Sequence, residues 1–298
     1  MSIYDLTYEE LLLSDEWRAK RKHIIHRDKM QCRMCGNQKT SELEVHHRYY
    51  VYNTSPWNYP DEALITLCKD CHTLIHETYS PLIYTVQNDK YVRMNFTPCN
   101  KCGGRGYIKE YKHIEGGICF RCRGHRFEEL IRNTNNSIKE SNFINLKMDV
   151  YDSPQIQLNE EEKEKIFYKG KDFHFGVHGE SFDLSKAYTM YLIAAQNGFA
   201  KGQNNCGLIL EGYYKNYYPA FIWFVYASMQ GIFQAQRKLS EYFKEGRTVP
   251  KNKLLTKKWK ELSSLNENRS INTKKDNYYW ANASKDALRF LFFGKLMK

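Results

Sequence analysis

The sequence has 298 residues, and 45 Lys and Arg against 34 Asp and Glu give it a formal charge of +11. With 42% hydrophobic and 27% charged residues, it has the composition of a folded protein rather than a disordered tail. The length allows one large domain or two to three small ones. No apolar run approaches the roughly 20 residues of a membrane span, which excludes a membrane-spanning protein. A basic chain favours a polyanionic partner.

Residues 1–13 contain acidic side chains and lack the basic start and cleavage site of a secretion signal, so we expect a cytoplasmic protein. Eight of the nine cysteines form C-x-x-C pairs, and Cys206 stands alone. In a reducing compartment such pairs indicate zinc sites rather than disulfides. The pairs are Cys32 with Cys35, Cys68 with Cys71, Cys99 with Cys102, and Cys119 with Cys122. We expect two structural zinc ions, each enclosed by four thiolates.

The first predicted element is a helix that begins after Ser14 and ends near His26. Ser14 is a good N-cap, and the acidic residues Asp15 and Glu16 follow it in the first turn. Farther along, residues 81–97 are rich in Tyr, Val and Ile and are expected to be extended.

Histidines accompany the first two cysteine pairs. His46 and His47 lie between these pairs, and His72 and His76 follow the second, which gives the order C-x2-C, H-H, C-x2-C-H-x3-H. In this order, residues 8–78 resemble the zinc-containing HNH endonucleases, a His-metal finger family. The resemblance implies a ββα-metal fold and metal-dependent hydrolysis of DNA. It also suggests a role in mobile-element or defence biology.

His72 and His76 stand four residues apart on an expected helix, so they project from one side and can share an ion. His46, from the preceding strand, would complete three ligands. The resemblance implies that His46 is a metal ligand and that His47 is the general base, which suits an imidazole with a pKa near 6.5. Three imidazoles favour Mn²⁺, Ni²⁺, Co²⁺ or Zn²⁺, with Mg²⁺ working only if phosphate and water supply the other ligands.

One position departs from the family pattern. The middle Asn of the family, which orients the loop and the base, corresponds to the position nine residues before His72, which is Ala63. A methyl group makes no hydrogen bonds, so Asp61, Glu62 or Asn58 would have to replace the amide. Two interpretations stay open: an active nuclease, or a zinc-stapled fold without catalytic chemistry.

The stretch from Arg18 to Lys39 contains eight basic residues and one acid, Asp28. Such a run is either a solvated helix face or, beside a phosphodiesterase site, a surface that neutralises DNA phosphates. The candidate DNA-binding side chains are Arg18, Lys20, Arg21, Lys22, Arg27 and Lys29. Aromatic residues after the histidine pair can either stack on bases or pack the loop itself. They are Tyr49, Tyr50, Tyr52 and Trp57.

The second cysteine cluster, Cys99-x2-Cys102-x16-Cys119-x2-Cys122, has the spacing of a four-cysteine zinc module. Each pair runs into glycines, so residues 98–126 resemble the C-x-x-C-x-G-x-G knuckles of the DnaJ-type zinc domain, with Arg126 in place of the last glycine. Two functions stay open for this module: it either binds DNA through its arginines or has a purely structural role. The arginines are Arg105, Arg121, Arg123 and Arg126.

The C-terminal half repeats a pattern with a period in the mid-thirties. The pattern is small-x3-aromatic-x2-small-x3-Gly, which places one packed face on a helix and ends the helix at the glycine. Its copies are Ala187, Tyr191, Ala194 and Gly198, then Ala220, Phe224, Ala227 and Gly231, then a degenerate Leu255, Trp259 and Leu262. About residues 166–265 resemble Sel-like repeats, relatives of the tetratricopeptide repeat, which implies a protein-binding surface. A plain helical domain is the alternative.

These patterns together predict an α+β multidomain protein. It comprises a ββα-metal HNH finger with structural zinc (1–80), a small β-rich zinc module (81–132), a linker (133–165), all-α Sel-like repeats (166–265) and a capping helix (266–298). The predicted function is a metal-dependent endonuclease that acts on DNA and recruits a protein partner. The alternative is a non-catalytic zinc protein that binds nucleic acid or scaffolds an assembly.

Overall fold

The computed structural model describes residues 11–52, 54–79, 82–87, 90–106, 108–111, 113–114, 117–124, 126–131 and 158–272. The chain divides into two compact units. The first unit is Met1–Arg33 with Asn37–Ser153, and the second is Met34–Gly36 with Pro154–Lys298. No helix among the described residues is long and apolar enough to cross a membrane.

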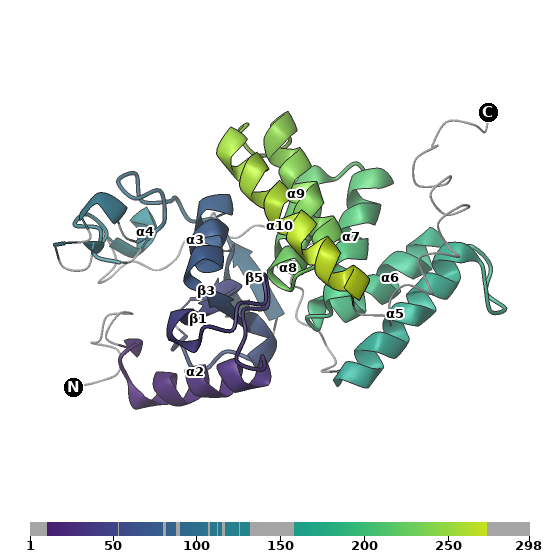
Figure 1. The fold of residues 1–298 in the computed structure, drawn as a ribbon, viewed down its shortest axis with the longest axis horizontal. Coiled ribbons are helices and arrows are strands. Elements are labelled where there is room, and N and C mark those ends of the chain that lie inside the picture. Colours follow the sequence, from purple (N-terminus) through teal and green to yellow (C-terminus); the bar gives the residue numbers. More distant parts are fainter. Residues whose placement is uncertain are drawn as a thin grey trace. The chain divides into compact units, whose positions relative to one another are not determined.

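The first unit begins with helix α2, Asp15–Arg27, at the purple end of the chain in Figure 1. The Ser14 hydroxyl accepts a hydrogen bond from the Trp17 amide at 3.1 Å, and two acids occupy the first turn. The predicted N-cap and helix are therefore confirmed. Trp17 and Ile24 are its buried side chains.

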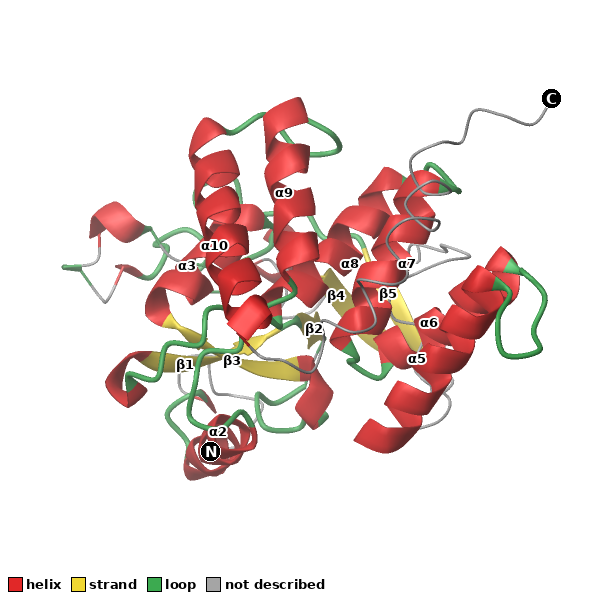
Figure 2. Cartoon of the chain, turned by 45° about the vertical axis from the view of Figure 1, so that its right-hand side comes forward, coloured by secondary structure: helices red, strands yellow, loops and turns green. Residues whose placement is uncertain are grey.

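Strand β1, Leu43–His47, pairs antiparallel with β3, Leu64–Cys68, and β3 leads directly into helix α3, Lys69–Thr78. All five residues of β3 are buried. Helices α2 and α3 lie on opposite sides of this strand pair (Figures 1 and 2). Two strands followed by a helix give the strand–strand–helix order expected for this part of the chain. Two 3-10 turns, η2 (Thr40–Glu42) and η3 (Asp61–Ala63), precede β1 and β3.

A second sheet contains β2, Tyr49–Val51, parallel to β4, Leu82–Gln87, which in turn pairs antiparallel with β5, Lys90–Met94. The expected extended segment is therefore confirmed as two strands. Phe127, beyond the second cysteine cluster, packs with Ile83, Met94 and Phe96 of this sheet and its edge.

The cysteine-bearing part of the predicted β-rich module is built from turns rather than strands. Its described residues include the isolated bridge of Pro98 to Phe127, a 3-10 turn η4 (Lys109–Tyr111) and the short helix α4 (Glu128–Ile131). Glycines with positive φ such as Gly104 and Gly106 turn the chain tightly around the sulfurs, which leaves no extended run for a ladder. The strands of region 81–132 belong instead to the sheet with β2.

The second unit is a run of helices in which each packs against the next. They are α5 (Glu160–Phe175), α6 (Leu184–Gln196), α7 (Ala200–Gly212), α8 (Tyr217–Met229), α9 (Phe233–Glu245) and α10 (Lys253–Asn272). The repeated small and aromatic residues of α6 and α8 are fully buried. Gly198 and Gly231 follow these helices with φ of 84° and 80°. The predicted helical repeat face is confirmed.

Two predicted boundaries differ from the structure. Helix α5 starts at Glu160, inside the predicted linker, because Asn159 and Glu162 form a reciprocal capping box. Helix α10 runs through the predicted boundary at 265/266, since Ser263 and Asn266 are buried along it. The predicted helix from Tyr278 to about Leu296 lies outside the described residues.

Candidate metal centres and nuclease site

Three groups of side chains bring metal-ligating atoms together. In each group the ligand atoms all lie within 4.8 Å of one another. The groups are Cys32, Cys35, Cys68 and Cys71; Cys99, Cys102, Cys119 and Cys122; and His46, His72 and His76. Every predicted metal ligand thus lies in the group in which the sequence placed it. His47 lies in none of them.

The first four cysteines come from the loop after α2, the last residue of β3 and the first turn of α3. Four thiolates make a tetrahedral set with no open position, which fits a structural zinc ion. Such an ion joins segments that are distant in sequence.

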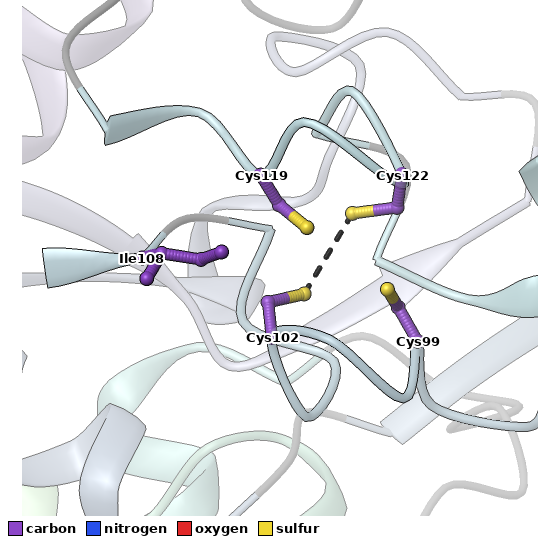
Figure 3. Packing of buried hydrophobic residues seen from close by; sticks show 5 residues of the cluster. All are labelled: Cys99, Cys102, Ile108, Cys119 and Cys122. Carbon is purple, nitrogen blue, oxygen red and sulfur yellow. Dashed lines mark hydrogen bonds between the residues drawn. The ribbon is translucent and has the colours of Figure 1, made fainter. Parts of the chain in front are cut away.

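The second set of cysteines is fully buried, with its four sulfurs turned toward one another beside Ile108 (Figure 3). The Sγ atoms of Cys102 and Cys122 are 3.6 Å apart, and the Gly106 amide donates to Cys102 Sγ at 3.2 Å. Burial raises the pKa of the Cys122 thiol to about 12. A dication supplies the charge that four converging thiolates require, so this set also fits zinc.

The three histidines converge from one strand and one helix. His46 lies on β1, and His72 and His76 lie one turn apart on α3 with their Nε2 atoms 3.1 Å apart. The His46 ring is 1% exposed, and neither of its nitrogens has a hydrogen-bond partner among the described residues. Two facing ring nitrogens and an unpartnered buried imidazole fit a shared divalent metal ion.

Burial keeps the imidazoles of His46 and His76 neutral. It lowers the pKa of His76 to about 3 and that of His46 well below the usual 6.5, and the neighbouring histidines add to both shifts. Neutral imidazoles offer lone pairs to a metal without first losing a proton.

Glu44 is a site residue that the sequence analysis did not assign. Its carboxylate accepts a hydrogen bond from His72 Nδ1, and this bond lowers the pKa of Glu44. With the proton on Nδ1, His72 presents its Nε2 lone pair to the other histidines. The signal was in the sequence, because residues two apart on a strand share a face, which places Glu44 with His46.

His47 is held by a backbone carbonyl of the loop that follows β2 and by aromatic rings. Its Nε2 lies 3.0 Å from the Pro56 carbonyl oxygen, so Nε2 carries the proton and Nδ1 the lone pair. The ring stacks on Trp17 at 5.1 Å and meets Tyr59 edge-on at 4.7 Å. Burial lowers the pKa of His47 to about 4, although the Pro56 bond opposes the shift.

Ala63, at the position of the family's Asn, is fully buried, and its backbone carbonyl accepts from the Arg48 amide at 2.9 Å. Asp61 does not substitute for the missing amide, because its carboxylate bonds Lys20 and His23 of α2. The Ala63 turn is thus joined by a backbone hydrogen bond to Arg48, the residue after β1, and the Pro56 carbonyl orients His47.

The candidate DNA-binding residues fall into two classes. Arg27 bonds Asp28 and the carbonyls of Asp61 and Leu64, and Arg21 bonds the Leu43 carbonyl. These two guanidiniums and Lys20, which pairs with Asp61, hold the fold together. The other three candidates, Arg18, Lys22 and Lys29, are exposed, and Arg18 pairs with Asp15.

The aromatic residues after the histidine pair also differ in their burial and contacts. Tyr49 is buried against Tyr59 and Tyr84, so it belongs to the core. Tyr50 is half-buried, and its ring stacks on His47 with centroids 5.5 Å apart. Tyr52 is exposed and meets Phe96 edge-on.

Comparison with known proteins gives a partial match to a nuclease. No protein-family model matches the chain. A probable HNH endonuclease of Lactococcus phage SK1 is 39% identical over 62 residues, which are 19% of this chain. The chain spans 65% of the length of that relative.

Two solved structures are similar to part of the chain. One is a protective antigen of uropathogenic Escherichia coli strains that displays an SLR fold, with 24% identity, a TM-score of 0.32, and coverage of 34% of this chain and 22% of that one. The other is a Sel1 repeat protein from Oxalobacter formigenes, with 22% identity and a TM-score of 0.33. The likeness covers 39% of this chain and 90% of that one.

Proposed function

We propose that this protein is a metal-dependent HNH endonuclease that hydrolyses DNA phosphodiester bonds. The observation that carries the proposal is the convergence of His46, His72 and His76 next to His47, whose proton position is fixed. The partial likeness to a probable HNH endonuclease supports it. We assign the chemistry to residues 1–80 and the recruitment of a protein partner to the helical repeats.

His46, His72 and His76 would hold one divalent metal ion. When bound, this ion supplies Lewis-acid stabilisation of the charge that develops on the phosphate and the leaving 3′ oxygen. Glu44 holds the His72 ring with its Nε2 lone pair toward the site. Three imidazoles are softer ligands than Mg²⁺ prefers, so we expect Mn²⁺, Ni²⁺, Co²⁺ or Zn²⁺ to support activity better.

His47 would take a proton from the attacking water through Nδ1. Because Pro56 accepts from Nε2, the ring is held in the tautomer that this step needs. With a pKa of about 4, the ring is in its basic form at neutral pH. Exposed basic residues of α2 and the following turn, Arg18, Lys22 and Lys29, would bind DNA phosphates.

The test is cleavage of supercoiled plasmid by the full chain over a series of divalent metals. We expect His47→Ala to bind metal normally and to cleave roughly two to four orders of magnitude more slowly. His46→Ala should weaken metal binding and recover part of its activity at high metal concentration. His26→Ala, at an exposed histidine of α2, is the control and should cleave normally. If metal rescues His47→Ala and not His46→Ala, the two roles are reversed.

The second candidate is a zinc protein that binds nucleic acid without cutting it. Ala63 favours it, because the amide that the HNH resemblance calls for is missing. Wild-type protein that binds DNA with both zinc ions in place, yet cleaves no DNA form with any metal, would establish this candidate instead.

A further inference from the structure

Arg126, in the second zinc module, is bonded to a tyrosine that stacks on His47. One Arg126 Nη donates to the Tyr50 hydroxyl at 2.7 Å, and the Arg126 Cζ lies 4.8 Å from the Tyr50 ring centroid. Tyr50 in turn stacks on the His47 ring. Residues 76 positions apart in the chain are thus joined beside the histidine site.

The zinc module fixes the backbone of Arg126 on both sides. Its amide donates to Cys122 Sγ, and its carbonyl accepts from the Cys99 amide at 2.8 Å. The next residue, Phe127, packs against Phe96 with ring centroids 5.9 Å apart. The module therefore holds this arginine against the sheet that contains Tyr50.

Two further features show that the local structure accommodates this side chain. Arg126 has a φ of 69°, a conformation that favours glycine, and it stands where the knuckle pattern has glycine. At Gly106, a Cβ atom would lie 3.1 Å from Arg126 Cγ and 3.3 Å from its Nε. The first knuckle thus leaves room for the arginine that the second knuckle carries.

The positive charge of Arg126 reaches the histidines. After burial, which is the largest effect, it is among the charges that lower the pKa of His46, His47 and His76. A guanidinium placed beside these histidines can bind an anion there, and a DNA phosphate is such an anion.

We propose that Arg126 is a catalytic residue, and that its guanidinium binds the DNA phosphate undergoing cleavage. This inference rests on the proposed nuclease function. On this proposal the second zinc module has a function besides its own stability. It positions a planar guanidinium that can donate two hydrogen bonds to the phosphate.

The test compares glycine substitutions at two basic residues of the second zinc module. Arg126→Gly removes the guanidinium and suits the backbone conformation, so the fold and both zinc ions should persist. Lys101→Gly is the control, because Lys101 is an exposed cation of the same zinc module. We expect single-turnover plasmid cleavage to fall roughly 10²-fold in Arg126→Gly and to stay within twofold of wild type in Lys101→Gly.

A second arm measures binding to a short DNA duplex by fluorescence anisotropy as salt is raised, without added catalytic metal. The loss of one phosphate contact should reduce the slope of log affinity against log salt by about 1 in Arg126→Gly alone. Cleavage by Arg126→Gly within twofold of wild type would overturn the proposal. If Arg126→Gly loses zinc, Arg126→Gln is judged by the same criteria. If the wild type cleaves no DNA, the nuclease proposal fails and the salt slope alone decides whether Arg126 contacts phosphate.

Discussion

In His72 and in His47, a neighbouring hydrogen-bond acceptor fixes which ring nitrogen carries the proton. Glu44 accepts from His72 Nδ1, and the Pro56 carbonyl faces His47 Nε2. His72 therefore presents Nε2, which suits its proposed role as a metal ligand, and His47 presents Nδ1, which suits its proposed role as the base. The proposed assignment thus depends on acceptors outside the histidine motif.

Replacing Glu44 tests the first of these acceptors. Glu44→Gln keeps the shape but weakens the hold on His72, so we expect affinity for the histidine-bound metal to fall roughly 10- to 100-fold. Metal titration of activity measures this shift, with Glu42→Gln, at an exposed carboxylate nearby, as the control. An unchanged titration midpoint in Glu44→Gln would show that the carboxylate does not orient His72.

Acid should destabilise the first unit. The folded pKa of His47 is about 4, below the unfolded value near 6.5, so the unfolded chain binds more protons as the pH falls. Stability is therefore complete above about pH 6.5 and is lost toward pH 4, by about 1.4 kcal/mol per pH unit for this residue.

Hydrogen exchange of the β1 and β3 amides between pH 7 and 5, corrected for intrinsic rates, measures this loss. His47→Phe fills the aromatic pocket without a titrating group, so its stability should depend less steeply on pH. Equal slopes for wild type and His47→Phe would mean that His47 titrates normally in the fold.

At the scale of elements, the sequence predicted those helices whose ends and buried faces are determined by residues close together in the chain. The helix after Ser14 and the buried faces of α6 and α8 follow from caps and periodicity. The start of α5 was missed because the Asn159 cap follows a polar stretch that resembles a linker. The bond of Pro56 to His47 and the position of Arg126 against Tyr50 could not be predicted, because both contacts arise only in the folded structure.

Helix α7 offers a test of close packing in the helical unit. A Cβ atom at Gly207 would lie 2.6 Å from the buried Phe224 ring, whereas at Gly212 it would meet nothing within 4 Å. We expect Gly207→Ala to destabilise the unit by roughly 1–3 kcal/mol through overpacking. Gly212→Ala should be neutral or stabilising by up to about 1 kcal/mol. Urea unfolding followed by circular dichroism compares them, and equal stabilities would contradict the close α7–α8 contact.

At the scale of the whole molecule, the metal content is the plainest expectation. Protein washed with a mild chelator should retain about two zinc ions per chain by elemental analysis. Cys119→Ser should lower the count to about one, whereas Cys206→Ser should leave it unchanged, since Cys206 is buried in α7 and belongs to neither group of cysteines. A wild-type count below one with the fold intact would defeat the zinc assignment.

Cys71 and His72 are consecutive residues in the first turns of α3, so one short helix carries ligands of two candidate metal centres. Zinc on the thiolate set would therefore be thermodynamically linked to the placement of the histidines. On the proposed function, a newly synthesised chain would be latent until zinc arrived, and scarcity of zinc would return it to latency. Cellular zinc supply would then set when the nuclease matures.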